Sequence, residues 1–108
     1  MLHGTPADAI LTNTTETEVI AAQGVNSHIY IHKIILSNQD STDTFVDFND
    51  STTTRLRKLA NPAGLGATYS FNERPVRLDS NEPLNAQQSA SVNPCNITVV
   101  YTVGSPAA

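Results

Sequence analysis

Apolar and polar residues alternate along several short stretches of the chain, and turn-forming residues separate these stretches. The clearest alternation runs through residues 95–103 (CNITVVYTV), where every second side chain from Cys95 on is apolar. Weaker alternation occurs at 16–22 and 43–48, and clusters of Asn, Asp, Ser and Gly lie between these segments. A period of two is typical of a β-strand with one buried face, and these clusters favour turns. The pattern therefore predicts a chain of short strands.

The stretch 25–38 (VNSHIYIHKIILSN) holds the densest run of β-branched and aromatic residues in the sequence. Its first half alternates, whereas Ile34, Ile35 and Leu36 are consecutive and apolar. A strand with both faces covered at one end and one face half exposed at the other has this pattern. We expect a central strand over about residues 27–37, with both faces of its second half covered.

Further short strands are expected at 10–11, 52–59, 68–71, 76–78 and 84–90. The segment 52–59 is the least regular, because Leu56, Leu59 and Ala60 are also spaced for one face of a helical turn. The chain shows no long helical period and no internal repeat. About seven to nine short strands with turns between them predict an all-β fold, an antiparallel β-sandwich of the jelly-roll type.

The length of 108 residues fits a single domain. The hydrophobic share is 39% and Trp is absent, so we expect a thin core that a partner surface helps to complete. Residues 1–9 contain Gly4 and Pro6 and show no period, so we expect a flexible N-terminal arm there. The sandwich domain is expected over 10–104 and a polar tail over 105–108.

Charge and cysteine content exclude several classes of protein. The net charge of −4 argues against a free-standing nucleic-acid-binding protein, which needs a basic face. The single cysteine, Cys95, allows no internal disulfide, and we expect it to be buried and inert. We find no signal peptide and no apolar run of the roughly 20 residues that span a bilayer. The sequence thus predicts a soluble protein of a reducing cytoplasm, without membrane contact.

His28 and His32 are the only candidate metal pair within one predicted element. On a strand they share a face with Tyr30 but lie roughly 13 Å apart, too far for one zinc ion to bridge. We expect this face to pack under a loop or against a neighbouring subunit. The acidic segment 40–50 lacks the spacing of a calcium loop, so we expect no metal site.

Five of the six cations lie in two short segments: Arg55, Arg57 and Lys58, and then Arg74 and Arg77. Two interpretations stay open for the first cluster. It can be a solvated face with weak ion pairs, or an electropositive patch that docks on an acidic protein surface. We find no nucleophile motif and no phosphate-binding glycine loop, and we therefore expect no catalytic residue, no cofactor and no enzymatic activity.

The order of motifs between about residues 17 and 103 resembles that of small bacteriophage virion proteins of about one hundred residues. Pro83 departs mildly from their pattern, which often has a small residue there. The motifs that carry the resemblance are VIAAQG at 19–24, IYIHKIILS at 29–37, FNERP at 71–75, NEPLN at 81–85 and NITVVY at 96–101.

The resemblance implies a capsid cement (decoration) protein that binds between major capsid protein subunits and has no catalytic activity. Such a protein assembles in the host cytoplasm and becomes part of the virion. It implies a homo-oligomer, a trimer. A small tail component, or a receptor- or carbohydrate-binding sandwich, is the alternative. We expect subunit contacts at His28, Tyr30 and His32. The expected capsid contacts are Thr5 and Pro6 in the arm and Arg55, Arg57 and Lys58 in the basic cluster.

Overall fold

The structure is a computed structural model of the 108-residue chain, and it describes residues 4–51, 54–71, 73–90 and 95–104, with the side chain of Arg55 left out. Within these residues the protein consists of strands, turns and loops, and no helix is long and apolar enough to cross a membrane. The strands are β1 (Thr5–Leu11), β2 (Thr17–Ile20), β3 (His28–Asn38), β4 (Thr44–Asn49), β5 (Thr54–Asn61), β6 (Gly66–Ser70), β7 (Val76–Arg77), β8 (Leu84–Gln88) and β9 (Cys95–Gly104).

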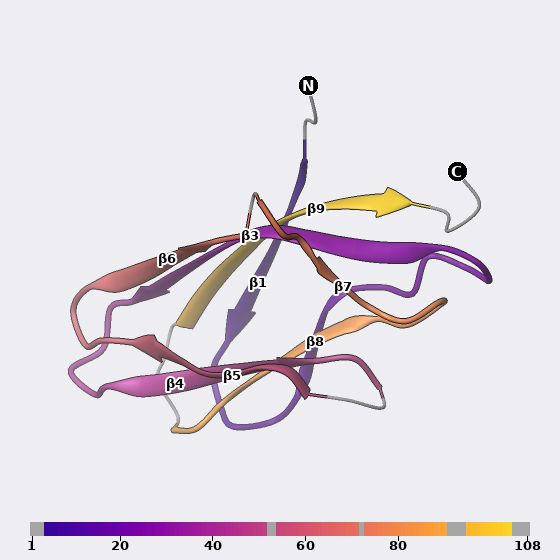
Figure 1. The fold of residues 1–108 in the computed structure, drawn as a ribbon. Helices are drawn as coiled ribbons and strands as arrows, with labels where there is room; N and C mark the ends of the chain where they lie inside the picture. Colours follow the sequence, from indigo (N-terminus) through magenta and orange to yellow (C-terminus); the bar gives the residue numbers. More distant parts are fainter. Residues whose placement is uncertain (1–3, 52–53, 72, 91–94, 105–108) are drawn as a thin grey trace.

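The strands form two antiparallel sheets that lie one above the other (Figure 1). The first sheet has the order β1-β9-β3-β6, with β7 pairing to β3, and the second has the order β2-β8-β4-β5. Strands from the first half of the chain pair with strands from the second half in mirror order: β1 with β9, β2 with β8, β3 with β6 and β7, and β4 with β5. This is a long hairpin rolled into two sheets, the jelly-roll arrangement. The predicted antiparallel sandwich is confirmed, and each expected strand has a counterpart.

The core lies between the two sheets and is built from every second residue of the long strands. On β9 the buried residues are Cys95, Ile97 and Val99, as the alternation of this segment predicts. Val46 and Phe48 of β4 face them from the second sheet and are fully buried. The hydrophobic effect at this single apolar layer holds the two sheets together.

A β-bulge in β3 changes which residues face the core. The register against β9 shifts between Ile31 and Lys33, so the buried positions change from Ile31 before the bulge to Ile34 and Leu36 after it. Ile35 consequently lies on the outer face of the first sheet, where it is 38% exposed. The expectation that both faces are covered here is wrong for the described part of the chain, because none of its segments packs as a further layer on that outer face.

The N-terminal segment also differs from expectation. Residues 5–9, expected in a flexible arm, belong to β1, which pairs with β9 from Thr5 opposite Tyr101 to Leu11 opposite Cys95. Residues 5–9 show little alternation of their own. The edge of β9 that faces away from β3 supplies their backbone hydrogen-bond partners, and this pairing orders them as a strand. The ends of the expected arm and tail, residues 1–3 and 105–108, lie outside the described residues.

The segment 52–59, which has the least regular pattern, belongs to strand β5 from Thr54 on, and its helix-like spacing has a structural cause. Leu59 lies opposite Val46 and Leu56 opposite Phe48, so β5 has two residues where β4 has one. This bulge places both leucines on the inner face although they are three residues apart. Lys58, at the bulge, has a φ of 53°. The alternative of a single helical turn is therefore wrong.

Candidate functional site

The three residues expected at a subunit interface lie along β3, and both histidines contact polar atoms of neighbouring segments. The Nδ1 atom of His28, which is buried, is 2.7 Å from the carbonyl oxygen of Leu78 and must donate to it. The Nε2 atom of His32 is 2.8 Å from the hydroxyl of Thr102 on β9. Each imidazole thus has one nitrogen bonded within the chain.

Tyr30 lies between the two histidines and packs against backbone. A Cβ atom added to Gly104 would be 2.9 Å from the Tyr30 ring, so glycine at this position lets the ring approach the end of β9. The rings of His28 and Tyr30 are tilted, with centroids 6.5 Å apart. These side chains are mainly engaged with their own chain, and their role at a subunit interface stays a prediction.

The basic cluster lies on β5, an edge strand of the second sheet. Arg57 and Lys58 are exposed, whereas the side chain of Arg55 lies outside the described residues. The backbone N–H of Lys58 donates to Oδ1 of Asp47 at 2.7 Å, which holds the bulge in place. Bulges and cations on an edge strand discourage pairing with other chains. Protection of the edge is therefore a structural role for the cluster, and docking on a partner stays a prediction.

The two parts of the expected capsid contact lie apart. Thr5 and Pro6 are exposed on β1, at one edge of the first sheet, whereas Arg57 and Lys58 are on β5, at one edge of the second. β1 lies beside β2, and β5 beside β3 and β6, so the two edges are on opposite sides of the sandwich (Figure 1). The structure does not combine these residues into one surface.

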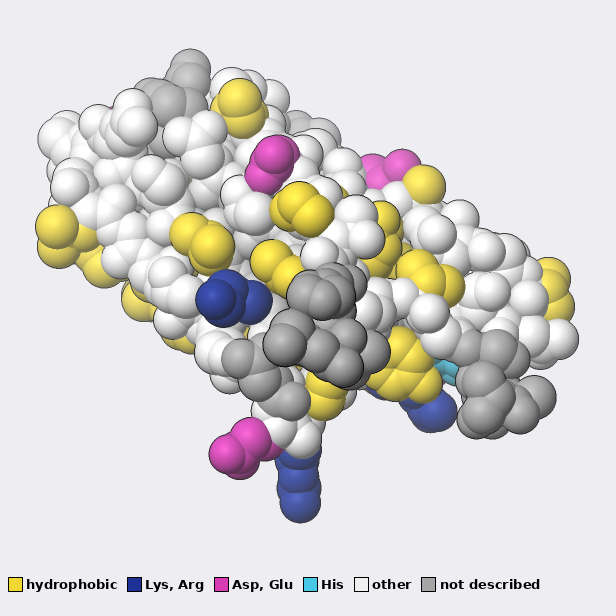
Figure 2. Space-filling view, turned by 90° about the horizontal axis from the view of Figure 1, so that it is seen from above, with side chains coloured by type: hydrophobic (Ala, Val, Ile, Leu, Met, Phe, Trp, Pro, Cys, Tyr) yellow, Lys and Arg dark blue, Asp and Glu magenta, His cyan; other side chains and the backbone are white. Residues whose placement is uncertain are grey.

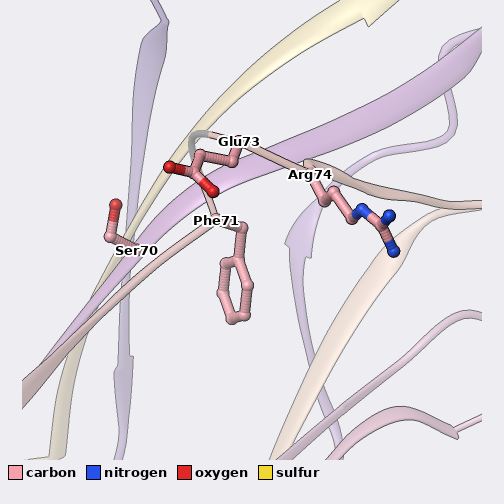
Figure 3. Close-up of a pocket in the computed structure, with 4 residues that line it drawn as sticks. All are labelled: Ser70, Phe71, Glu73 and Arg74. Carbon is pink, nitrogen blue, oxygen red and sulfur yellow. The ribbon is translucent and has the colours of Figure 1, made fainter.

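An open depression of about 690 Å³ lies at the connection between β6 and β7, and sequence reasoning did not find it. Its described lining consists of Ser70, Phe71, Glu73 and Arg74 (Figure 3). The Phe71 ring points toward the second sheet (Figure 3). The backbone N–H of Phe71 donates to the carbonyl oxygen of His32 at 2.7 Å. The side chains of Glu73 and Arg74 are exposed and point in different directions (Figure 3). The described lining brings no nucleophile to a base.

Carboxylates of the acidic segment hold turns together. Oδ1 of Asp43 accepts a hydrogen bond from the backbone N–H of Ala63 at 2.8 Å. Oδ1 of Asp47 likewise accepts from the backbone N–H of Lys58. Among the residues that the structure describes, no group of three His, Cys, Asp or Glu side chains is arranged to hold a metal ion.

A buried polar cluster joins the two sheets at one end of the sandwich. Nδ2 of Asn38 donates to the carbonyl oxygens of Thr42 and Asn61, at 2.8 Å in both cases. Nδ2 of Asn61 donates to Sγ of Cys95 at 3.3 Å. Burial raises the pKa of the Cys95 thiol, and the hydrogen bond from Asn61 offsets part of this effect. The arrangement favours a neutral, structural thiol.

We therefore expect Cys95 to react with a thiol reagent only when the chain unfolds. At neutral pH the native protein should react at least about 100-fold more slowly than the chain in guanidinium, because burial blocks access and disfavours the thiolate. Stopped-flow mixing with a chromogenic disulfide reagent measures both rates. Fast labelling of the native protein, at the rate of the unfolded chain, would contradict the burial of this thiol.

Comparison with known proteins identifies the fold and no family. No family model matches the sequence, and no curated protein matches it. A chain in the acidic stable capsid structure of Helicobacter pylori bacteriophage KHP30 is similar, with a TM-score of 0.59 and 16% identity over 95% of this chain and 94% of that one. The nucleoplasmin-like N-terminal domain of Drosophila FKBP39 is also similar, with a TM-score of 0.50 and 4% identity over 94% of this chain and 90% of that one.

A chain in a virus-like particle of the Macrobrachium rosenbergii extra small virus, from the giant freshwater prawn, has a TM-score of 0.47 and 12% identity, over 93% of this chain and 75% of that one. The likenesses are of fold. At 16% and 4% identity, the similarities to the phage KHP30 chain and to the FKBP39 domain establish the fold alone.

Proposed function

We propose that this chain is a bacteriophage capsid cement protein, which stabilises the head by binding between subunits of the major capsid protein. The observation that carries the proposal is the fold match to a phage capsid chain over nearly the whole of both chains. The matched parts of the two chains are therefore of similar length. The motif order that resembles small phage virion proteins points in the same direction.

The distribution of the expected contacts suits a bridging role. A cement protein holds two neighbouring subunits, and this chain presents Thr5 and Pro6 on one side and Arg57 and Lys58 on the other. Cations at one side would orient the protein on an acidic capsid surface, and apolar contacts would supply affinity.

The proposal includes no enzymatic activity. A virion protein of this kind acts through buried interface area, which in a reducing cytoplasm substitutes for disulfides. The described residues offer large exposed apolar side chains for such contacts, among them Ile10, Val25 and Leu65.

Co-sedimentation with purified heads of the phage that encodes the chain tests the proposal. We expect saturable binding of the wild-type protein and at least about tenfold weaker binding of the variant Arg57→Glu/Lys58→Glu, because the basic edge would then repel an acidic surface. The matched control Arg74→Glu/Arg77→Glu carries the same charge change on the β7 side and should bind like wild type. A wild-type protein that stays in the supernatant would remove the cement role.

One observation favours the alternative of a receptor- or carbohydrate-binding tail module. Phe45 is 48% exposed on β4 and lines a small hollow of about 150 Å³ with Ala60 and Pro62. An exposed aromatic ring is the platform on which sugars stack. A glycan array tests this alternative. If the isolated chain binds glycans and the variant Phe45→Ala does not, the protein is a carbohydrate-binding tail module and not a capsid cement protein.

A further inference from the structure

β1 is an outer strand of the first sheet, and among the strands that the structure describes none pairs with its outer side. Its register against β9 runs from Thr5 to Leu11 without a shift. The other outer strands are less regular: β2 and β5 contain register shifts, and β6 and β7 have only five and two residues. β1 is therefore the described sheet edge with the longest continuous register.

This edge also has little protection against pairing with another chain. Bulges, lysines and prolines normally protect an edge, because its unpaired N–H and C=O groups bind other strands. β5 has a bulge with Lys58 in it. β1 has no bulge and no Lys or Arg, and its protecting residues are Pro6 and Asp8. The second half of the strand ends in an apolar side chain, Ile10, which is 61% exposed.

Two hydrogen bonds beside β6 show in which direction each residue of the first sheet presents its backbone groups. The N–H of Asn38 donates to the carbonyl oxygen of Leu65 at 3.1 Å, and the carbonyl oxygen of His32 accepts from the N–H of Phe71 at 2.7 Å. In an antiparallel strand the N–H and C=O of one residue point to the same side, and the side alternates along the chain. Even-numbered residues of β3 from 32 to 38 thus point toward β6, and residues 33, 35 and 37 point toward β9.

The same alternation continues through β9 to β1. Ile35 lies opposite Thr98, so the backbone of Thr98 points toward β3 and that of its neighbour Ile97 points toward β1. Ile97 lies opposite Ala9, whose N–H and C=O therefore point toward β9. The residues before and after Ala9 present their backbone groups at the outer edge.

The outer edge of β1 consequently offers both N–H and C=O at Asp8 and at Ile10. At Pro6 it offers the C=O alone, which agrees with the preference of proline for strand positions whose nitrogen faces solvent. An antiparallel strand can therefore form two complete hydrogen-bonded pairs with this edge, at residues 8 and 10.

We propose that this edge pairs with the same edge of a second copy of the chain, antiparallel, about a two-fold axis that passes beside Ala9. Asp8 then lies opposite the partner subunit's Ile10, and Ile10 lies opposite the partner subunit's Asp8. Each pair exchanges two N–H···O=C hydrogen bonds, made by groups that no described strand of the single chain pairs with. The contact is isologous and joins the two first sheets into one.

The side chains favour this register over its neighbours. A pairing of Asp8 with itself sets like charges opposite each other, and a pair that contains Pro6 loses one N–H donor. In the proposed register the small side chain of Ala9 lies at the axis, and the two Ile10 side chains are diagonal neighbours that can contact each other. Asp8 accepts a hydrogen bond from the hydroxyl of Thr98 on β9 at 2.7 Å, which draws its carboxylate away from the axis.

The outer face of the first sheet has few charges for a second copy to meet. Figure 2, which views the molecule from the side of this sheet, shows acidic and basic side chains that lie apart, with hydrophobic and uncharged ones between them. Two such faces can therefore lie side by side in one continuous sheet without a concentration of like charges.

The two-fold contact predicts a dimer, which differs from the trimer that the resemblance implies. Self-association is a property of the isolated chain and is measured without heads. Failure of this proposal and failure of the cement role can therefore be told apart.

Sedimentation equilibrium of the full chain, at up to ~100 μM, tests the contact. We expect wild-type protein to dimerise and Ile10→Pro to weaken the dimer at least about tenfold, because each copy loses an outward N–H and an apolar contact. The matched control is Thr68→Pro at the other edge of the same sheet. Thr68 is exposed and lies opposite Ile35, so its N–H also points outward, and this variant should dimerise like wild type. Thermal melts check that both variants fold. A wild-type monomer at all concentrations, or a trimer, would overturn the proposal.

Cross-linking tests the register without relying on proline. Ala9→Cys should form a disulfide-linked dimer on oxidation with copper phenanthroline, because the two residues meet as a non-hydrogen-bonded pair with Cα atoms about 4.5 Å apart. In Ala7→Cys, the matched control, the two cysteines lie roughly 13 Å apart along the strands and should not be linked. Wild-type protein, whose Cys95 is buried, gives the background. Equal linkage of the two variants, or none in Ala9→Cys, would contradict the proposed pairing.

Discussion

A chain that lacks residues 1–11 is expected not to fold into the sandwich, whereas a chain that lacks residues 1–3 is expected to fold. The longer deletion removes β1, which pairs along its whole length with β9, and removes the buried side chain of Leu11. The loss leaves the inner residues Ile97 and Val99 of β9 without their cross-strand neighbours Ala9 and Ala7. Burial of one leucine stabilises by about 1.5–3 kcal/mol, and the lost strand pairing adds to this.

The combined loss is comparable to the 5–15 kcal/mol by which small domains are stable. Circular dichroism during thermal unfolding measures the outcome: we expect a cooperative transition for the short deletion and none for the long one. This also decides how the N-terminus can be tested for capsid binding, since deletion of residues 1–9 would damage the sheet itself. A cooperative transition in the chain without β1 would contradict the role given to this strand.

Phe48→Ala should destabilise the fold by about 3–5 kcal/mol, the range for truncation of a buried phenylalanine. Phe48 is 0% exposed and lies opposite Leu56 and Ala86, at the centre of the second sheet. Because Phe48 is fully buried, we expect a value in the upper part of this range.

Phe45→Ala is the matched control, on the same strand and of the same chemistry. Phe45 is 48% exposed on the opposite face, and its truncation should change the free energy of unfolding by less than about 1 kcal/mol. Urea denaturation of both variants, followed by circular dichroism, measures the difference. Equal destabilisation by the two substitutions would mean that the faces of β4 are assigned wrongly.

The alternation of apolar residues was sufficient to predict the strands and the fold class. β9 shows this most clearly, because its pattern from Cys95 to Val99 is the burial pattern of the folded strand. The sequence also contained the candidate residues for contacts. It could not show that Thr5 and Pro6 lie on the side opposite Arg57 and Lys58, because this depends on the order of strands in two sheets.

The bulges were beyond prediction from the chain alone. A period of two identifies the face of each residue only while the register is continuous, and one extra residue exchanges the faces. This happens in β3, where Ile35 lies outside, and in β5, where Leu56 and Leu59 have the spacing of a helix. Whether a strand contains a bulge depends on the strand beside it.

Local alternation and turn residues thus determined that this protein is a β-sandwich, since they act through each strand's own backbone and two faces. The tertiary structure alone decided three further features: the pairing of β1, the exposure of Ile35 and the separation of the two candidate contact edges. Each of them depends on which strand supplies the neighbouring hydrogen bonds, and that partner is distant in the sequence.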